Sequence, residues 1–278
     1  MLPDGLRLGP AELVVRDLER SIAFYRDVLG LRVHARDERS AALGAGEEDV
    51  LRLHLVPDAR PAGRHAGLYH VALLFPTREE LARVATRLAT TRTGIQGASD
   101  HGTHEAIYLP DPDGNGLELA ADRPREQWPD VRNPYAMGPQ PLDTRGLLAT
   151  VEDEPPSAQA ATGLRVGHVH LHVGDLDRAV AHYRDVLGFQ EMARMDSAVF
   201  VAAGGYHHHV GLNTWKGEGA GPVPDGVAGL RRWTVVLGDG QALRDLVRRA
   251  EAAGAQVRQG DEGAAIRDAW GIELLAVV

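Results

Sequence analysis

The stretch DLERSIAFYRDVLG at residues 17–30 returns, with few changes, as DLDRAVAHYRDVLG at residues 175–188. Each copy begins with an aspartate, Asp17 or Asp175, which can cap the start of a helix, and ends with a glycine that can terminate one. Apolar residues recur between these ends at helical spacing. The pattern predicts the same helix twice and indicates that the chain contains an internal repeat.

A second repeat lies between the two copies and after them. GLYHVALLF (67–75) and GLRRWTVVL (229–237) each read as a strand followed by a helical pattern. Both of these segments end in a similar way, with DPDGNGLEL (111–119) and DAWGIELL (268–275). Four units of one strand, one helix and three strands are therefore predicted. Their approximate ranges are 7–57, 66–122, 165–214 and 229–278.

The units group into two halves along the sequence. We expect an N-terminal half at 1–122, a linker at 123–164 that is rich in Pro, Gly and Ser, and a C-terminal half at 165–278. Strands of antiparallel type with one helix per unit are typical of the α+β class. The predicted fold is thus four βαβββ modules that form two barrel-like halves.

Composition narrows the classes of function. The chain has 278 residues, a formal net charge of −9 and no cysteine. Disulfides, thiolate zinc sites, iron–sulfur clusters and a cysteine nucleophile are excluded. The acidic balance argues against a nucleic-acid or anionic-membrane surface. No basic and apolar leader opens the sequence, and no apolar run approaches the roughly 18 residues that span a bilayer, so we expect a cytoplasmic protein.

Histidine is the unusual component. There are 13 histidines, and seven of them fall between His168 and His209. In HVHLHV, the side chains of His168, His170 and His172 lie on one face of a strand because strand side chains alternate. A row of buried neutral imidazoles is costly without partners. With no thiols in the chain, a metal would have to be held by imidazole and carboxylate groups.

The repeat shows which units can hold that metal. The aligned first-strand positions are Pro10, His70, His168 and Arg232, and the closing strands of units two and four offer Glu118 and Glu273. A set of two histidines and one carboxylate needs ligands from adjacent strands and leaves coordination positions open. Where no histidine completes the set, as in unit four, we expect Glu273 to pair with Arg232 or with solvent.

Only one pairing of units completes the set. Units three and four would place Arg232 where a ligand should lie, and a cation repels a divalent metal. Units one and two would leave Pro10 in the remaining position. Units two and three bring together His70, Glu118 and His168. We therefore predict that the two middle units share a barrel and that the metal lies between them.

One segment of unit two carries a known motif. His101-x5-Ile-Tyr108-x2-Asp-Pro-x-Gly-x3-Glu118 resembles the signature of extradiol ring-cleavage dioxygenases, with Ser99 as a mild departure from it. The four-unit layout resembles the vicinal oxygen chelate superfamily, which also holds glyoxalase I and bleomycin-resistance proteins. The whole chain, including GHVHLHV, GGYHHHVGLN and ADRPREQW, looks like the two-domain bacterial catechol 2,3-dioxygenases.

The resemblance implies a mechanism. It makes His70, His168 and Glu118 the ligands of Fe(II), with Mn(II) as the alternative ion. His101 and Tyr108 become catalytic groups that contact the substrate, and a closing-strand histidine of unit three becomes the acid–base residue. The reaction implied is cleavage of a catechol-type diol by O2 beside its hydroxyls, which gives a product of the 2-hydroxymuconic-semialdehyde type.

Alternation suggests which of the three consecutive histidines faces the metal. If Val210 and Leu212 lie under the helix, His208 lies with them, and His209 faces the site together with, less strongly, His207. We therefore predict His209 as the acid–base residue. His207, His170 and Trp215 are predicted to line the substrate cavity; His172 is a further candidate for its wall.

Two other functions stay open from the sequence. A glyoxalase-I-like lyase or isomerase would hold Zn or Ni with His209 as a fourth protein ligand. A binding protein like the bleomycin-resistance members would lack the metal triad. The partners expected for the dioxygenase are a small aromatic diol and O2, with no nucleic acid and no membrane, and a homo-oligomer is left open.

Overall fold

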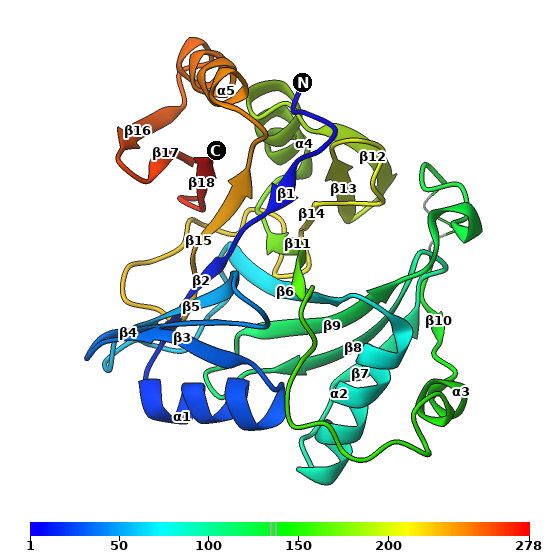
Figure 1. The fold of residues 1–278 in the computed structure, drawn as a ribbon. Helices are drawn as coiled ribbons and strands as arrows, with labels where there is room; N and C mark the ends of the chain where they lie inside the picture. The colour runs from blue at the N-terminus through cyan, green and yellow to red at the C-terminus, as the bar shows by residue number, and fades with distance from the viewer. Residues whose placement is uncertain (134, 137) are drawn as a thin grey trace.

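A computed structural model describes residues 1–133, 135–136 and 138–278 of the chain (Figure 1). It contains the four predicted units and confirms the α+β class. In each unit a first strand leads into a helix, and three further strands follow. A two-residue strand, β1 (Arg7–Leu8), precedes the first unit.

The first two units have closely related element orders. Unit one comprises β2 (Ala11–Val15), α1 (Leu18–Ala23), the π-helical turn η1 (Phe24–Val28), β3 (Arg32–Arg36), β4 (Ser40–Gly44) and β5 (Asp49–Leu55). Unit two comprises β6 (Gly67–Phe75), α2 (Arg78–Thr90), β7 (Gly97–Asp100), β8 (His104–Pro110) and β9 (Gly116–Asp122).

The last two units repeat this order. Unit three comprises β11 (Arg165–His172), α4 (Leu176–Val180), the π-helical turn η3 (Ala181–Val186), β12 (Gln190–Met195), β13 (Ala198–Ala202) and β14 (Val210–Asn213). Unit four comprises β15 (Gly229–Val236), α5 (Gly240–Ala252), β16 (Gln256–Gly260), β17 (Gly263–Arg267) and β18 (Glu273–Val277).

The repeated helices begin and end as their sequences predict. Asp17 accepts a hydrogen bond from the backbone N–H of Arg20, and Asp175 accepts one from the N–H of Arg178. The closing glycines of both copies have positive φ angles of 80° and 92°, a conformation that glycine adopts without steric cost.

The units pair crosswise into two sheets. Units two and three form one nine-stranded sheet in the order β10-β7-β8-β9-β6-β11-β14-β13-β12. Units one and four form the other, in the order β16-β17-β18-β15-β2-β5-β4-β3, with β1 beside β15. We call them the middle-unit sheet and the end-unit sheet. Figure 1 shows cyan β6 beside green β11, and blue β2 beside orange β15. Units two and three, which were predicted to share a barrel, are thus paired with each other in one sheet.

Helices and turns connect the two sheets within each half of the sequence. Tyr25 of η1 donates its hydroxyl to Asp111 in the turn before β9, and Tyr183 of η3 donates its hydroxyl to Asp268 in the turn before β18. Arg87 of α2 donates to the backbone carbonyl of residue 29 in the same way. The predicted halves at 1–122 and 165–278 and the two sheets therefore divide the chain differently.

The predicted linker at 123–164 has structure of its own. It contains a short 3₁₀ turn η2 (Arg125–Gln127), β10 (Gln140–Pro141) and α3 (Thr144–Ala149). β10 extends the middle-unit sheet beyond β7, and α3 packs against α2. Among the residues that the structure describes, none belongs to a helix with the length and apolar character to cross a membrane.

Candidate metal centre and its cavity

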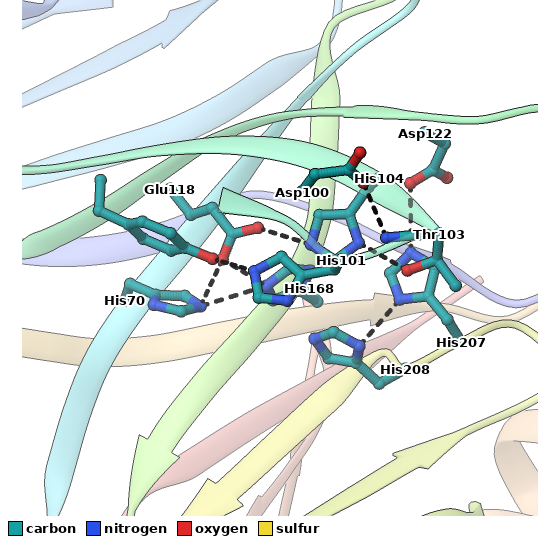
Figure 2. Close-up of polar contacts among 12 residues, drawn as sticks. His70, Asp100, His101, Thr103, His104, Glu118, Asp122, His168, His207 and His208 are labelled. Atoms are coloured by element: carbon teal, nitrogen blue, oxygen red, sulfur yellow. Dashed lines mark hydrogen bonds and ion pairs between the residues drawn. The ribbon is translucent and has the colours of Figure 1, made fainter. Parts of the chain in front are cut away.

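Three adjacent strands of the middle-unit sheet place three predicted ligands together. His70 is on β6, Glu118 on β9 and His168 on β11. In the strand register, Ala72 lies between Glu118 on one side and His168 on the other, and His70 is two residues away on the same face. Figure 2 shows the side chains of His70, Glu118 and His168 pointing toward one another.

The distances between these groups are compatible with one bound metal ion. Glu118 Oε2 lies 2.9 Å from His70 Nε2 and 3.2 Å from His168 Nε2, and the two Nε2 atoms are 3.2 Å apart. Ligand atoms at right angles on bonds of about 2.1 Å are separated by about 3 Å. All three side chains are buried. The three ligand atoms are therefore close enough together for one metal ion to bind all of them.

Glu118 has the charge state that a metal requires. Burial alone would raise its pKa, but the imidazoles of His168, His70 and His104 around it outweigh burial and hold the pKa well below its usual range. Burial lowers the pKa of His168, which favours the neutral ring. An ionised carboxylate and neutral imidazoles are the forms that coordinate metals.

The triad opens into a cavity of about 370 Å³, at the lower end of the usual range for small-molecule sites. Its wall includes residues from both middle units and from the segment before β10. They are Tyr69, His70, Ser99, His101, Thr103, His104, Tyr108, Glu118, Gly138, Pro139, His168, His170, Met195, Phe200, His208 and Trp215. A single substituted aromatic ring is a suitable occupant by size.

His101 and Tyr108 of the predicted signature lie in this wall and contact each other. The distance between His101 Nε2 and the Tyr108 hydroxyl is 2.8 Å. Tyr108 is directly opposite Glu118 in the β8–β9 register, so its side chain lies on the same face as the triad. Burial, followed by the charge of Glu118, raises the pKa of Tyr108, which keeps its hydroxyl protonated and able to donate.

The three consecutive histidines take different positions from those that alternation predicts. His208 lines the cavity and its ring lies 4.1 Å from that of His168, between centroids. His209 instead accepts a hydrogen bond from the backbone N–H of Ala203 and packs against Phe189. The reason is local: β14 begins at Val210, so residues 207–209 precede the strand and do not alternate. The structure therefore places His208, not His209, beside the candidate metal site.

Of the three residues predicted to contact the substrate, two line the cavity and one does not. His170 and Trp215 are part of the cavity wall, with Trp215 half exposed at its edge. The Nε2 atom of His170 is buried and has no hydrogen-bonding partner within the described ranges. His207 is outside the wall and contacts Asp122, with 3.2 Å between Nε2 and Oδ1.

His104 is a site residue that the sequence analysis did not identify. Its Nε2 lies 3.0 Å from the second carboxylate oxygen of Glu118, and its Nδ1 lies 2.8 Å from the Thr103 hydroxyl. A signal was present in the alternation of β8, because His104 and Tyr108 are four residues apart and share a face of the strand.

The end-unit sheet corrects one expectation. Glu273 contacts Arg267 and Arg258, whereas Arg232 contacts Glu12. Register explains the difference: Leu274 is aligned with β15 as Leu117 is aligned with β6, so the place of Glu118 is taken by the residue after Leu274, not by Glu273. The sequence alignment of the two closing strands was displaced by two residues.

Comparisons with known proteins agree with this architecture. The family model described as "Glyoxalase/Bleomycin resistance protein/Dioxygenase superfamily" matches residues 7–119 and 165–274. A protein of Bacillus subtilis (strain 168) named catechol-2,3-dioxygenase is 42% identical over 271 residues, which cover 95% of this chain and 94% of that protein.

Two solved structures share the fold. Glyoxalase I from Zea mays is 18% identical, with a TM-score of 0.62, over 98% of this chain and 92% of that one. A putative dioxygenase from Bacillus subtilis is 13% identical, with a TM-score of 0.64, over 97% of this chain and 84% of that one. At these identities the likeness concerns the fold alone. From the family match and the 42% identity, the chain belongs to the glyoxalase/bleomycin resistance protein/dioxygenase superfamily.

Proposed function

We propose that this protein is an Fe(II)-dependent extradiol dioxygenase that cleaves a catechol-type diol with O2. The observation that carries the proposal is the position of His101, Tyr108 and His208 in one cavity wall with the triad. A metal that must bind both a diol and O2 needs open positions, and three protein ligands leave them. The catechol-2,3-dioxygenase relative supports the choice of reaction.

His70, Glu118 and His168 would hold the metal. Bound Fe(II) would supply open coordination positions and the redox chemistry that O2 requires. Mn(II) prefers similar ligands and is the alternative ion. The two oxygen atoms of O2 both enter the product, so that catechol and O2 give 2-hydroxymuconic semialdehyde without another reactant.

The side chains around the metal ligands would accept a proton from the substrate and orient it by hydrogen bonds. His208 is neutral because burial lowers its pKa well below the usual range, so it can accept a proton from a diol hydroxyl. Tyr108 keeps its proton and, paired with His101, can donate a hydrogen bond to a substrate oxygen. These roles replace the one that the sequence assigned to His209.

The outer part of the cavity is suited to the aromatic ring. Tyr69, Phe200 and Trp215 line it, and the Tyr69 and Trp215 rings meet edge to face at 5.1 Å between centroids. The buried Nε2 of His170, which has no partner among the residues that the structure describes, favours a polar substituent on that ring, since such a group would satisfy it.

Metal analysis and oxygen uptake test the proposal. Protein purified without air and reconstituted with Fe(II) should bind about one ion per chain, consume O2 with catechol and form a yellow ring-fission product. Glu118→Ala should lose both the iron and the activity. The matched control is Glu273→Ala, another buried glutamate on a closing strand, which should keep both. Full iron and full activity in Glu118→Ala would refute the assignment.

The same assay separates the two other functions. A lyase of the glyoxalase type would bind Zn or Ni and show no O2 uptake with any catechol. Its expected fourth ligand, His209, is turned toward Ala203 in the structure. A protein that only binds ligands would hold no metal tightly. The cytoplasmic location and the open question of a homo-oligomer stay predictions from the sequence.

A further inference from the structure

A chain of polar contacts leads from the cavity to the edge of the middle-unit sheet. His208 Nδ1 lies 2.8 Å from His207 Nδ1, and His207 Nε2 lies 3.2 Å from Asp122 Oδ1. The other oxygen of Asp122 accepts a hydrogen bond of 2.9 Å from the Tyr206 hydroxyl. Figure 2 shows the first two contacts in line, with His208 at one end and Asp122 at the other.

The direction of each hydrogen bond follows from the group at the outer end. Burial alone would raise the pKa of Asp122, but the hydrogen bonds from His207 and Tyr206 outweigh it and lower the pKa. The carboxyl group is therefore ionised, and an ionised carboxylate can only accept. Hence the Nε2 atom of His207 carries a hydrogen and donates it to Asp122.

The inner contact is then determined as well. Burial lowers the pKa of His207 to about 3, so its ring is neutral and carries one hydrogen only. Because that hydrogen is on Nε2, the Nδ1 atom of His207 is an acceptor. The Nδ1 atom of His208, 2.8 Å away, must then be the donor.

We propose that Asp122 and His207 are positioning residues that hold His208 in one tautomer, with hydrogen on Nδ1 and the Nε2 lone pair available to the cavity. His208 lines the cavity, and its Nε2 has no hydrogen-bonding partner in the described part of the chain. The role of this lone pair in catalysis rests on the proposed function, whereas the tautomer itself does not.

The tautomer decides what His208 can do. With hydrogen on Nδ1, the free Nε2 can accept a hydroxyl proton from a bound diol. In the other tautomer, Nε2 would carry the hydrogen and could only donate. The His104 ring stacks on His207, at 4.8 Å and 14° between planes, and so holds His207 in the orientation that both contacts require.

A second metal ion is the competing interpretation of this region. Ligand atoms of His104, Asp122 and His207 lie within 4.8 Å of one another. However, the near-parallel rings of His104 and His207 direct their in-plane lone pairs side by side instead of toward one point. Both oxygens of Asp122 already accept hydrogen bonds. The contacts therefore favour a hydrogen-bonded relay over a second ion.

Nuclear magnetic resonance of ¹⁵N-histidine-labelled protein tests the tautomers directly. The full chain should be loaded with Zn(II), which is diamagnetic, and long-range ¹H–¹⁵N correlations recorded. We expect His208 to carry hydrogen on Nδ1 and His207 on Nε2. A wild-type spectrum with hydrogen on Nε2 of His208 overturns the proposal without any variant. Binding of two Zn(II) ions per chain, with loss of the His207 N–H signal, would assign the second metal site instead.

Substitutions test the cause. Asp122→Leu and His207→Leu should each leave His208 as a mixture of tautomers. His207→Gln should restore the single tautomer, because its amide can donate to Asp122 and accept from His208. Tyr206→Phe is the matched control, since it removes the other hydrogen bond to Asp122 and keeps the carboxylate. An unchanged His208 signal in folded Asp122→Leu would contradict the proposal.

Kinetics separate this inference from the proposed function. With Fe(II), Asp122→Leu should lower kcat about ten- to a hundredfold, part of what acid–base groups contribute, with KM for catechol and iron content nearly unchanged. If the wild-type protein consumes no O2, the proposed function fails and the tautomer result stands. If the wild type is active and Asp122→Leu keeps its kcat, the positioning role fails alone.

Discussion

The middle-unit sheet and the end-unit sheet have the same strand order around their centres but opposite chemistry. In the middle-unit sheet, His70 is opposite His170 across the β6–β11 pair; at the same point of the end-unit sheet, Arg232 is opposite Glu12. The Arg232 guanidinium lies 2.6 Å from a Glu12 oxygen, and this glutamate is almost fully buried. One sheet provides a cation of its own, and the other provides groups that could bind one.

The difference between the two sheets lies in a few side chains and not in the backbone fold. A buried carboxylate requires a positive partner or hydrogen bonds. Arg232 meets this need for Glu12, whereas Glu118 has imidazole partners, of which His70 and His168 could hold a metal together with it and His104 contacts its other oxygen. Exchange of a few residues on one backbone thus converts a structural ion pair into a candidate metal centre.

The largest effect is expected from His70→Arg, which places in the middle-unit sheet the residue that the end-unit sheet has at this position. The new cation would contact Glu118 and repel a divalent ion. We expect metal content to fall from about one per chain to none, oxygen uptake to disappear, and the protein to remain folded. Elemental analysis and thermal unfolding measure these outcomes. A variant that still bound one ion per chain would show that His70 is not a ligand.

The converse change, Arg232→Met, removes the cation of the end-unit sheet. Among the described residues, Glu12 would keep His54 and the more distant Arg231 as partners, so we expect a loss of about 3 kcal/mol in the free energy of unfolding. Urea unfolding measures this loss. Metal content should not change. The double variant Glu12→Leu/Arg232→Met should recover most of the stability, and a double variant as unstable as the single one would contradict the ion-pair explanation.

His104→Phe tests whether the hydrogen bond to Glu118 contributes to metal affinity. The ring would keep its stacking on His207 but lose the hydrogen bond to Glu118, so Glu118 would be less firmly oriented. Loss of such outer contacts typically lowers metal affinity about ten- to a hundredfold. Competition with a chelator measures the affinity. His54→Phe, which affects Glu12 in the other sheet, is the control and should leave it unchanged.

The pairing of the units could be predicted from the sequence because the chemistry of individual residues excluded the other pairings. Pro10 and Arg232 cannot serve as ligands, so only units two and three could complete the triad, and their strands do pair in one sheet. The capping residues predicted the helices for an equally local reason, since Asp17 needs only the backbone N–H three residues ahead.

The remaining parts of the site depend on tertiary structure. His208 reaches the cavity because the chain before β14 is irregular, and alternation has no meaning there. The contact of His207 with Asp122 joins residues that are 85 positions apart, on units three and two. Glu273 was misaligned because the sequence comparison matched one glutamate to the other, although the turns from Asp111 to β9 and from Asp268 to β18 have the same length and leave Leu275 in the place of Glu118.

The two tyrosines that connect the sheets give the smallest and most discriminating comparison. Tyr25 donates to an oxygen of Asp111 that also accepts from the Asn115 amide, whereas Tyr183 donates to an Asp268 oxygen with no other hydrogen-bond donor in the described ranges. Tyr25→Phe should therefore lower the free energy of unfolding by about 1 kcal/mol, and Tyr183→Phe by about 2 kcal/mol, because a buried acceptor left without a donor costs more than a lost bond. Urea unfolding of both variants measures the difference. Equal losses would mean that the second donor at Asp111 contributes nothing, and the two halves would then be stabilised alike despite their different turns.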